Sequence, residues 1–150
     1  MVDFFSNTII VSCLAAWLSA QVIKTILVFI TTKKLDLQRM FGAGGMPSAH
    51  SAMVTALTIT VGEISGVSSV EFAISVVFTL VVIYDAMGVR RQAGEHAKML
   101  NRVAYTLEQE NQNNESPILM KFDELKELLG HTPLEVLGGI VLGILVSMCI

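Results

Sequence analysis

The sequence predicts an all-α integral membrane protein in which about four membrane-crossing segments form a helical bundle. Its composition is one reason: 53% of the 150 residues are hydrophobic, only 15% are charged, and the mean hydropathy is +0.64. A soluble domain of this size rarely needs so much apolar surface. The second reason is that the apolar residues are gathered in runs long enough to cross a hydrocarbon core roughly 30 Å thick. We therefore expect residues 1–150 to form a single membrane-embedded domain.

The first predicted segment covers residues 8–30 and contains one charged residue, Lys24. It lacks a positively charged start and exceeds the usual core of a signal peptide, so we interpret it as a retained anchor. Two shorter apolar runs, 51–61 and 72–84, predict the second and third segments, each extended by polar residues at one end. The fourth segment, 132–150, again contains one charged residue, Glu135.

The distribution of basic residues predicts the orientation of the chain. Residues 33–47 and 85–131 fall on one side of the membrane, and the loop GEISGVSS falls on the other. Nine of the ten Lys and Arg residues lie on the first side, and Lys24 lies inside the first segment. The positive-inside rule makes the first side cytoplasmic in a cell membrane, although basic residues kept for anion binding would give the same count. The net charge of -3 argues against a nucleic-acid partner.

The stretch between the third and fourth segments has three predicted parts. Residues 89–109 form a helix that continues from the third segment or lies at the interface. A polar linker follows near 109–116. Pro117 in the first helical position and Gly130 as a stop signal then bound an apolar-faced interfacial helix near 117–129.

The first of three polar groups at the same side opens the second segment, as Pro47-Ser48-Ala49-His50. A helix N-terminus with unpaired N–H groups favours phosphate binding, and the Ser48 hydroxyl could add a donor. The alternative is that Ser48 only caps the helix while His50 reaches toward the surface. The tetrapeptide alone supports both interpretations about equally.

The second polar group combines Asp85 with Arg90 and Arg91. Guanidinium groups bind phosphate oxygens in a bidentate manner, which predicts a substrate-binding role. Paired arginines just after a membrane helix are also a common topology signal, and without the other groups that interpretation is favoured.

The third polar group is the pair His131 and Glu135. A carboxylate four residues after a histidine can select its tautomer and stabilise its imidazolium form, as an activated nucleophile requires. Residues 132–135 also match a capping box with proline in the first helical position, and Glu135 can serve both purposes. Further along, Gly139 and Gly143 form a small-xxx-small pair, which predicts a close helix contact rather than a ligand site.

Lys24 is the fourth candidate. It lies roughly 12 Å along the helix from Thr32, too deep for easy snorkelling, so we expect it to face the bundle. There it would pair with a bound anion or with an acid such as Asp85 or Glu135, and Gln21 shares its face.

The motifs resemble a known superfamily. PSAH resembles the Pro-Ser-Gly-His motif of the type 2 phosphatidic acid phosphatases, whose superfamily includes the vanadium haloperoxidases, and HTPLEVLGGIVLG resembles its last motif. With GGMPSAHSA, DAMGVRRQAGEHA and LGHTPLEVLGG in this order, nearly the whole chain resembles the small divergent branch of that superfamily.

This resemblance implies a membrane lipid phosphatase that acts on a lipid phosphate or diphosphate through a phosphohistidine, without a cofactor or metal. His131 would be the nucleophile, Glu135 would orient it, and His50 would protonate the leaving oxygen. The implied substrate-binding residues are Ser48, Arg90, Arg91, Lys24 and Asp85.

Several positions depart from the superfamily pattern. Ala49 replaces a glycine, Glu135 replaces an aspartate, and Leu125 stands where an arginine is usual six residues before the nucleophile, so Arg90 or Arg91 would have to supply that guanidinium. His96 is a rival nucleophile, but Leu100 stands four residues later in place of an acid. Because the superfamily commonly has six helices, a homodimer could complete the bundle. The alternative function is a catalytically inactive membrane protein that binds phospholipid or another anion, and a haloperoxidase is less favoured.

Overall fold

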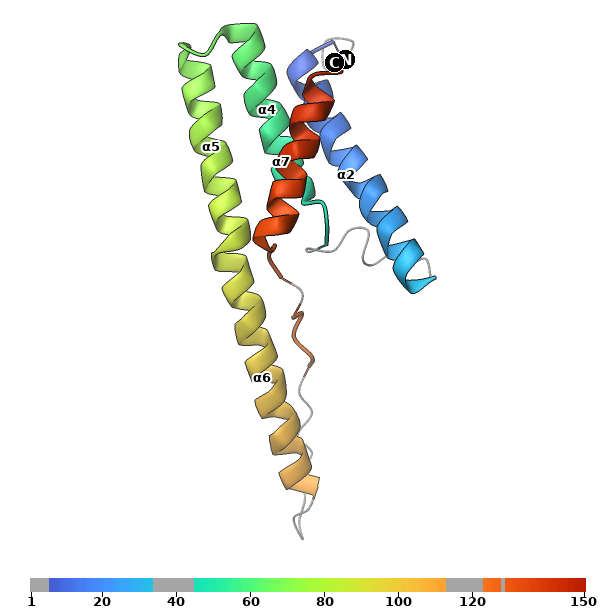
Figure 1. Ribbon diagram of the computed structural model, residues 1–150. Helices are drawn as coiled ribbons and strands as arrows, with labels where there is room; N and C mark the ends of the chain where they lie inside the picture. Colours follow the sequence, from blue (N-terminus) through green and yellow to red (C-terminus); the bar gives the residue numbers. More distant parts are fainter. Residues whose placement is uncertain (1–5, 34–44, 113–122, 128) are drawn as a thin grey trace.

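The protein is an all-helical bundle (Figure 1). The computed structural model describes residues 6–33, 45–112, 123–127 and 129–150. Within these residues the helices are α2 (Thr8–Thr32), α4 (Ala49–Ser65), α5 (Val70–Met87), α6 (Val89–Gln112) and α7 (Pro133–Ser147), and there are no strands. Helices α2, α4, α5 and α7 correspond to the four predicted segments. The all-α prediction is therefore confirmed.

The helices have the length and composition of a membrane bundle. Helix α2 and the almost continuous rod Val70–Asn111, which joins α5 to α6, are each long and apolar enough to cross a membrane, and α7 is a shorter apolar helix. Each predicted segment begins at a side-chain cap that satisfies free N–H groups of the first turn: Asn7, Ser48, Ser69 and Thr132.

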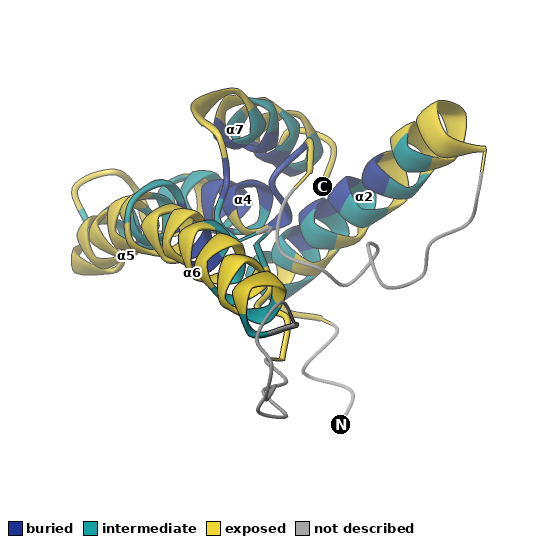
Figure 2. Ribbon diagram, turned by 90° about the horizontal axis from the view of Figure 1, so that it is seen from below, coloured by how far each residue is buried: buried dark blue, intermediate teal, exposed yellow. Residues whose placement is uncertain are grey.

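Helix α4 occupies the centre of the bundle. It packs against α2, α5 and α7, and Figure 2 shows its buried residues enclosed between those helices. This position explains why α4 can contain so many hydroxyl residues, because its neighbours separate them from lipid. The Thr60 hydroxyl donates to that of Ser12 on α2 at 2.9 Å, and the Thr79 hydroxyl on α5 donates to the Val54 carbonyl at 2.9 Å.

Small residues fill the interior and large apolar residues face outward. The buried cluster consists entirely of alanines: Ala16, Ala20, Ala49, Ala52 and Ala56. Large side chains such as Leu18, Ile74 and Val141 are instead more than half exposed. A soluble bundle would bury these side chains, whereas lipid solvates them and small residues allow the helices to approach closely. The chain is therefore a membrane helical bundle.

The predicted close contact at Gly139 and Gly143 is confirmed. A Cβ atom at Gly139 would overlap the Ser48 carbonyl oxygen and lie 2.8 Å from Ser51 Cβ. A Cβ atom at Gly143 would lie 2.5 Å from the Ala52 carbonyl oxygen. Glycine at both positions thus lets α7 lie directly against the backbone of α4.

Helix α6 continues in the direction of α5 after a break at Gly88 and projects beyond the other helices (Figure 1). The helix predicted for 89–109 is therefore confirmed as a continuation of the third segment. It extends to Gln112, so the beginning of the predicted 109–116 linker is helical, and the rest of that linker lies outside the described residues.

The interfacial helix predicted near 117–129 is not found in the part that can be compared. Residues 117–122 and 128 lie outside the described residues, while residues 123–127 and 129 have no helical structure. The physical reason is competition for backbone hydrogen bonds. The Asn101 side chain on α6 accepts from the Leu125 N–H at 3.0 Å and donates to the Leu125 carbonyl at 2.9 Å. Both main-chain groups of Leu125 are thereby bound to α6.

We predict that Gly139→Ala and Gly143→Ala will each destabilise the bundle, whereas Gly138→Ala will not. The first two substitutions overpack a backbone contact, which costs about 1–3 kcal/mol. At Gly138 the closest atom to a new Cβ atom is the terminal methyl of Met46, at 3.1 Å, and this flexible side chain can move; Met46 Cγ and Pro47 Cβ lie at an ordinary contact distance of 3.6 Å. All three changes gain similar helix propensity, so thermal unfolding in detergent isolates the packing effect. Equal melting temperatures for the three variants would contradict the prediction.

Candidate active site

Polar residues from four elements meet at one end of the bundle around a small cavity that is open to solvent. The N-terminus of α4, the C-terminus of α5, the first turn of α6 and the loop before α7 all contribute. The lining residues are His50, Val82, Asp85, Ala86, Arg90, Gly130 and His131. Four of the predicted site residues (His50, Asp85, Arg90 and His131) therefore surround one space although they are up to 81 positions apart in the sequence.

The backbone of His131 is attached to the end of α5. Its N–H donates to the Ala86 carbonyl at 2.9 Å. This carbonyl belongs to the last turn of α5, where the break at Gly88 leaves acceptors available to other partners. The preceding Gly130 has φ 79°, and a Cβ atom there would overlap the Arg91 N–H and lie 2.6 Å from Arg91 Cα. Glycine is thus required for the loop to approach α6 so closely.

The imidazole of His131 is held by Glu135. Its Nδ1 lies 3.2 Å from Glu135 Oε2, and the side chain is only 4% exposed. Glu135 Oε2 also accepts from the Thr132 N–H at 2.9 Å, so the predicted capping box is present and Glu135 serves both purposes. With Nδ1 donating to a carboxylate, the Nε2 lone pair is free for chemistry.

Burial lowers the pKa of His131 below its ordinary value. The hydrogen bond and negative charge of Glu135 oppose this effect, while the positive charges of Lys24 and Arg90 add to it. The net result is an imidazole that stays neutral at pH 7, as a nucleophile must be.

The second histidine faces the first across the cavity. The ring centroids of His50 and His131 are 6.3 Å apart, with the planes inclined at 58°. The Ser48 N–H donates to the Glu135 carbonyl at 2.9 Å, which joins the start of α4 to the first turn of α7. The helix that carries His50 is therefore linked to the first turn of α7, the helix that follows His131.

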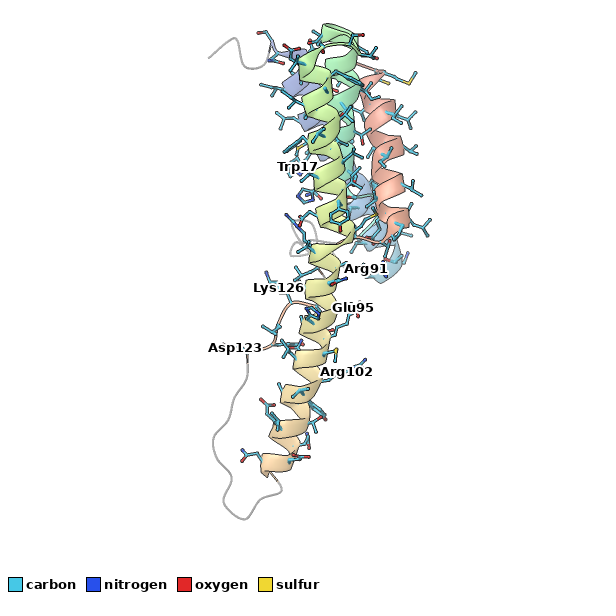
Figure 3. All side chains as sticks on the ribbon, turned by 90° about the vertical axis from the view of Figure 1, so that its left-hand side faces the viewer. Trp17, Arg91, Glu95, Arg102, Asp123 and Lys126 are labelled. Atoms are coloured by element: carbon cyan, nitrogen blue, oxygen red, sulfur yellow. The ribbon has the colours of Figure 1, made fainter. Side chains whose placement is uncertain are left out.

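Arg90 lines the cavity and Arg91 does not. The Nε atom of Arg90 donates to Asp85 Oδ2 at 2.6 Å. This bond leaves the two terminal amino groups of the guanidinium available to a ligand. Because the side chains of Arg90 and Asp85 are 51% and 40% exposed, water screens the pair and it contributes little to stability. Arg91 is exposed on the first turn of α6 (Figure 3).

Ser48 acts as a helix cap. Its side-chain oxygen accepts from the Ser51 N–H at 3.3 Å and from the Ser51 hydroxyl at 3.0 Å. The side chain is completely buried and is not part of the cavity lining. The capping interpretation is therefore confirmed, and the hydroxyl of Ser48 does not face the cavity in this structure.

Lys24 faces the bundle as expected and is only 4% exposed. It forms no direct ion pair with Asp85 or Glu135, which instead bind Arg90 and His131. Its charge nevertheless lies close enough to His131 to influence it. Gln21, one turn away on the same face, has a buried Oε1 atom that no described group hydrogen-bonds.

Two residues that the sequence analysis weighed against the superfamily motifs lie away from the cavity. His96 is exposed on α6, and Leu125 contacts α6 through its backbone. The sequence did not identify Val82, Ala86 or Gly130 as lining residues. The sequence indicated Gly130 only as the end of a helix. The carbonyl group of Ala86 could not be predicted as a contact, because every residue has such a group. Among the described residues, no group of three or more His, Cys, Asp or Glu side chains could hold a metal ion.

Comparison with known proteins identifies the family of this chain. Residues 5–146 match the model of the Divergent PAP2 family. A Bacillus subtilis (strain 168) protein named "Uncharacterized membrane protein YuiD" is 41% identical over 150 residues, which cover 97% of this chain and 95% of that protein. No solved structure matches the chain. The resemblance of the three motifs is thus confirmed, and the chain belongs to the Divergent PAP2 family.

Proposed function

We propose that this protein is a membrane phosphatase that hydrolyses a lipid phosphate or diphosphate monoester through a phosphohistidine at His131. The observation that carries this proposal is the arrangement of the His131 ring. Glu135 holds its Nδ1 at 3.2 Å, while the ring lines an open cavity shared with His50 and Arg90. Nucleophile, orienting carboxylate, proton donor and guanidinium are then all present at one place.

In the first step, Nε2 of His131 attacks the phosphorus atom and forms an N–P bond. The bond from phosphorus to the lipid oxygen breaks, and His50, whose protonated form is favoured by the negative charge of the bound substrate, transfers its proton to that oxygen. Glu135 stabilises the positive charge that develops on the phosphorylated imidazole. The two rings, with centroids 6.3 Å apart, both line the cavity, so the proposal puts the phosphoryl group between them.

In the second step, water attacks phosphorus and the N–P bond breaks. His50, now neutral, accepts the proton of the water molecule, and inorganic phosphate leaves. This sequence regenerates neutral His131 and protonated His50. The chemistry requires positioning and charge stabilisation, which the chain supplies from its own side chains.

Three positive features favour an anionic substrate. The terminal amino groups of Arg90 can bind two phosphoryl oxygens. In the first turn of α4, Ser48 caps the Ser51 N–H, while the N–H groups of Ala49 and His50 have no partner among the described residues and lie at the positive end of the helix dipole. Lys24 is buried without a hydrogen-bonded or ion-paired acid among the described residues, so a bound anion would compensate its charge.

The dimensions of the bundle favour a lipid as the substrate. Helices α4 and α7 have 17 and 15 residues, or roughly 25 and 22 Å of length. Both are shorter than a hydrocarbon core of about 30 Å, so the site-bearing ends are recessed from the headgroups toward the acyl chains, where a lipid substrate can reach them. The proposal places this end at the cytoplasmic face. The proposed chemistry uses His50, Arg90, His131 and Glu135 of a single chain.

We predict that purified protein in detergent releases phosphate from at least one of phosphatidate, phosphatidylglycerol phosphate and a polyprenyl diphosphate. His131→Ala should reduce the rate by about a thousandfold or more, because it removes the nucleophile. It should still bind a non-hydrolysable phosphonate analogue of the substrate. His96→Ala is the matched control and should retain full activity, since His96 is exposed away from the cavity.

Two results would contradict this prediction. If the wild-type protein binds phospholipid but releases no phosphate from any of the three substrates, the chain is a lipid-binding protein without turnover. If His96→Ala abolishes release and His131→Ala does not, the nucleophile is misassigned.

The second prediction concerns pH. Because the pKa of His131 lies below the ordinary value of 6.5, the acidic limb of the kcat/KM profile should lie below pH 6.5, where protonation removes the nucleophilic lone pair. Glu135→Gln removes the negative charge that raises this pKa, so its acidic limb should move to still lower pH. The same change should lower kcat about tenfold to a hundredfold, the effect of a hydrogen bond to a charged group worth about 1.5–3 kcal/mol. A limb that stays in place in Glu135→Gln would argue against His131 as the titrating group.

The third prediction separates the two arginines. Arg90→Ala should raise KM about tenfold to a hundredfold, because a charged hydrogen bond to phosphate is worth about 1.5–3 kcal/mol. Arg91→Ala removes the same charge from the neighbouring position and should leave KM nearly unchanged, since Arg91 does not line the cavity. Steady-state kinetics of both variants test this, and equal effects would show that only the general charge matters.

A further inference from the structure

The segment that leads to His131 lies along the side of α6. We call residues 123–127 and 129–131 the return segment. Figure 3 shows the part that carries Asp123 and Lys126 running beside α6, which carries Arg91 and Arg102. The return segment has no helix or strand, so it has no regular internal backbone hydrogen bonding. Its conformation must therefore depend on contacts with α6.

A single side chain makes most of those polar contacts. The Asn101 carboxamide accepts from the Leu125 N–H at 3.0 Å and donates to the Leu125 carbonyl at 2.9 Å. Its amide also donates to Glu127 Oε1 at 2.9 Å. Asn101 thus binds the return segment at two residues and satisfies both main-chain groups of one of them.

Glycines bring the two partners into direct contact. A Cβ atom at Gly94 on α6 would lie 2.7 Å from the Glu127 carbonyl oxygen. Further along, Gly130 lies against the backbone of Arg91. The Leu129 N–H donates to the Glu127 carbonyl at 3.0 Å and turns the chain toward the site. At Leu125, Glu127, Leu129 and Gly130, the return segment therefore lies against α6.

We propose that Asn101 is a positioning residue for His131: it fixes the register of the return segment on α6, the helix that also carries Arg90. This inference rests on the proposed phosphatase function. Asn101 lies roughly 16 Å along the helix from Arg90, so it does not touch the substrate. Because one rigid helix carries Arg90 and holds the segment that ends in His131, it sets their separation. A nucleophile displaced by about 1 Å can lose about a hundredfold in rate.

The first test does not require enzymatic activity. Diethyl pyrocarbonate modifies neutral imidazoles, and the chain has three histidines. In the wild type His96 is exposed and should react quickly, whereas His131 is 4% exposed and should react slowly. Asn101→Ala should increase the rate at His131 at least fivefold and leave the rate at His96 unchanged, as measured by peptide mass spectrometry. Arg102→Ala, a change at the neighbouring exposed position, is the matched control and should alter neither rate.

The second test uses kinetics. Asn101→Ala should lower kcat about tenfold with little change in KM, because the phosphate-binding groups remain. Asn101→Asp places a carboxylate against Glu127 and should lower kcat similarly. Adding Glu127→Gln to that variant restores a hydrogen bond between positions 101 and 127 with the polarity reversed. The Leu125 carbonyl still lacks its donor, so part of the lost kcat should be recovered. Glu127→Gln alone should not raise the activity of the wild type.

The outcomes separate this inference from the phosphatase proposal. Unchanged reactivity of His131 in a folded Asn101→Ala variant would overturn the positioning role. If Asn101→Ala does not fold, the failure of Glu127→Gln to rescue Asn101→Asp would overturn it instead. If the wild type releases no phosphate while His131 becomes more reactive in Asn101→Ala, the positioning of His131 is supported and the phosphatase function fails.

Discussion

The close approach of α7 to α4 is the constraint on which the rest of the structure depends. Gly139 and Gly143 lie against the carbonyl oxygens of Ser48 and Ala52, so the two backbones touch where any side chain would separate them. At the same end, the Ser48 N–H reaches the Glu135 carbonyl at 2.9 Å. The two candidate catalytic histidines sit on or beside these helix ends, and their separation follows from this packing. In a membrane, where lipid removes the hydrophobic drive between helices, such small-residue contacts are the main source of specific association.

Around this contact, polar side chains are kept away from lipid and are paired with other polar groups. The hydroxyl residues of α4 are enclosed by three other helices and bind one another or backbone carbonyls. At the site, each strongly polar group has a defined role: Glu135 caps α7 and holds His131, and Asp85 holds Arg90 through Nε. Lys24 is the exception among the described residues, because it is buried without a paired acid. The negative charge of Glu135 acts on Lys24 without a direct contact, and in the proposed function a bound anion would balance the remaining charge.

Helix α6 and the return segment extend the site beyond the bundle. Their contact at Asn101, Gly94 and Gly130 connects a projecting helix to the loop that carries His131. Membership of the Divergent PAP2 family agrees with the motif order, and the B. subtilis relative carries only the description of a membrane protein. The chemical assignment therefore rests on this chain's own geometry: a buried histidine fixed by a carboxylate, a second histidine opposite it and a guanidinium beside both.

The sequence by itself determined what depends on local pattern. Apolar runs predicted the four segments. Residue spacing predicted the Thr132–Glu135 capping box and the close contact at Gly139 and Gly143. The motifs identified His50, Arg90, His131 and Glu135 among the candidate site residues. Only the tertiary structure decided that Arg90 rather than Arg91 lines the cavity, that Ser48 turns its hydroxyl inward, and that residues 123–127 bind α6 instead of forming a helix. The reason is that helical periodicity and capping are set by neighbours a few residues apart. The partner of Leu125 is Asn101, 24 positions earlier, and no local pattern encodes a hydrogen bond formed only when two distant segments pack together.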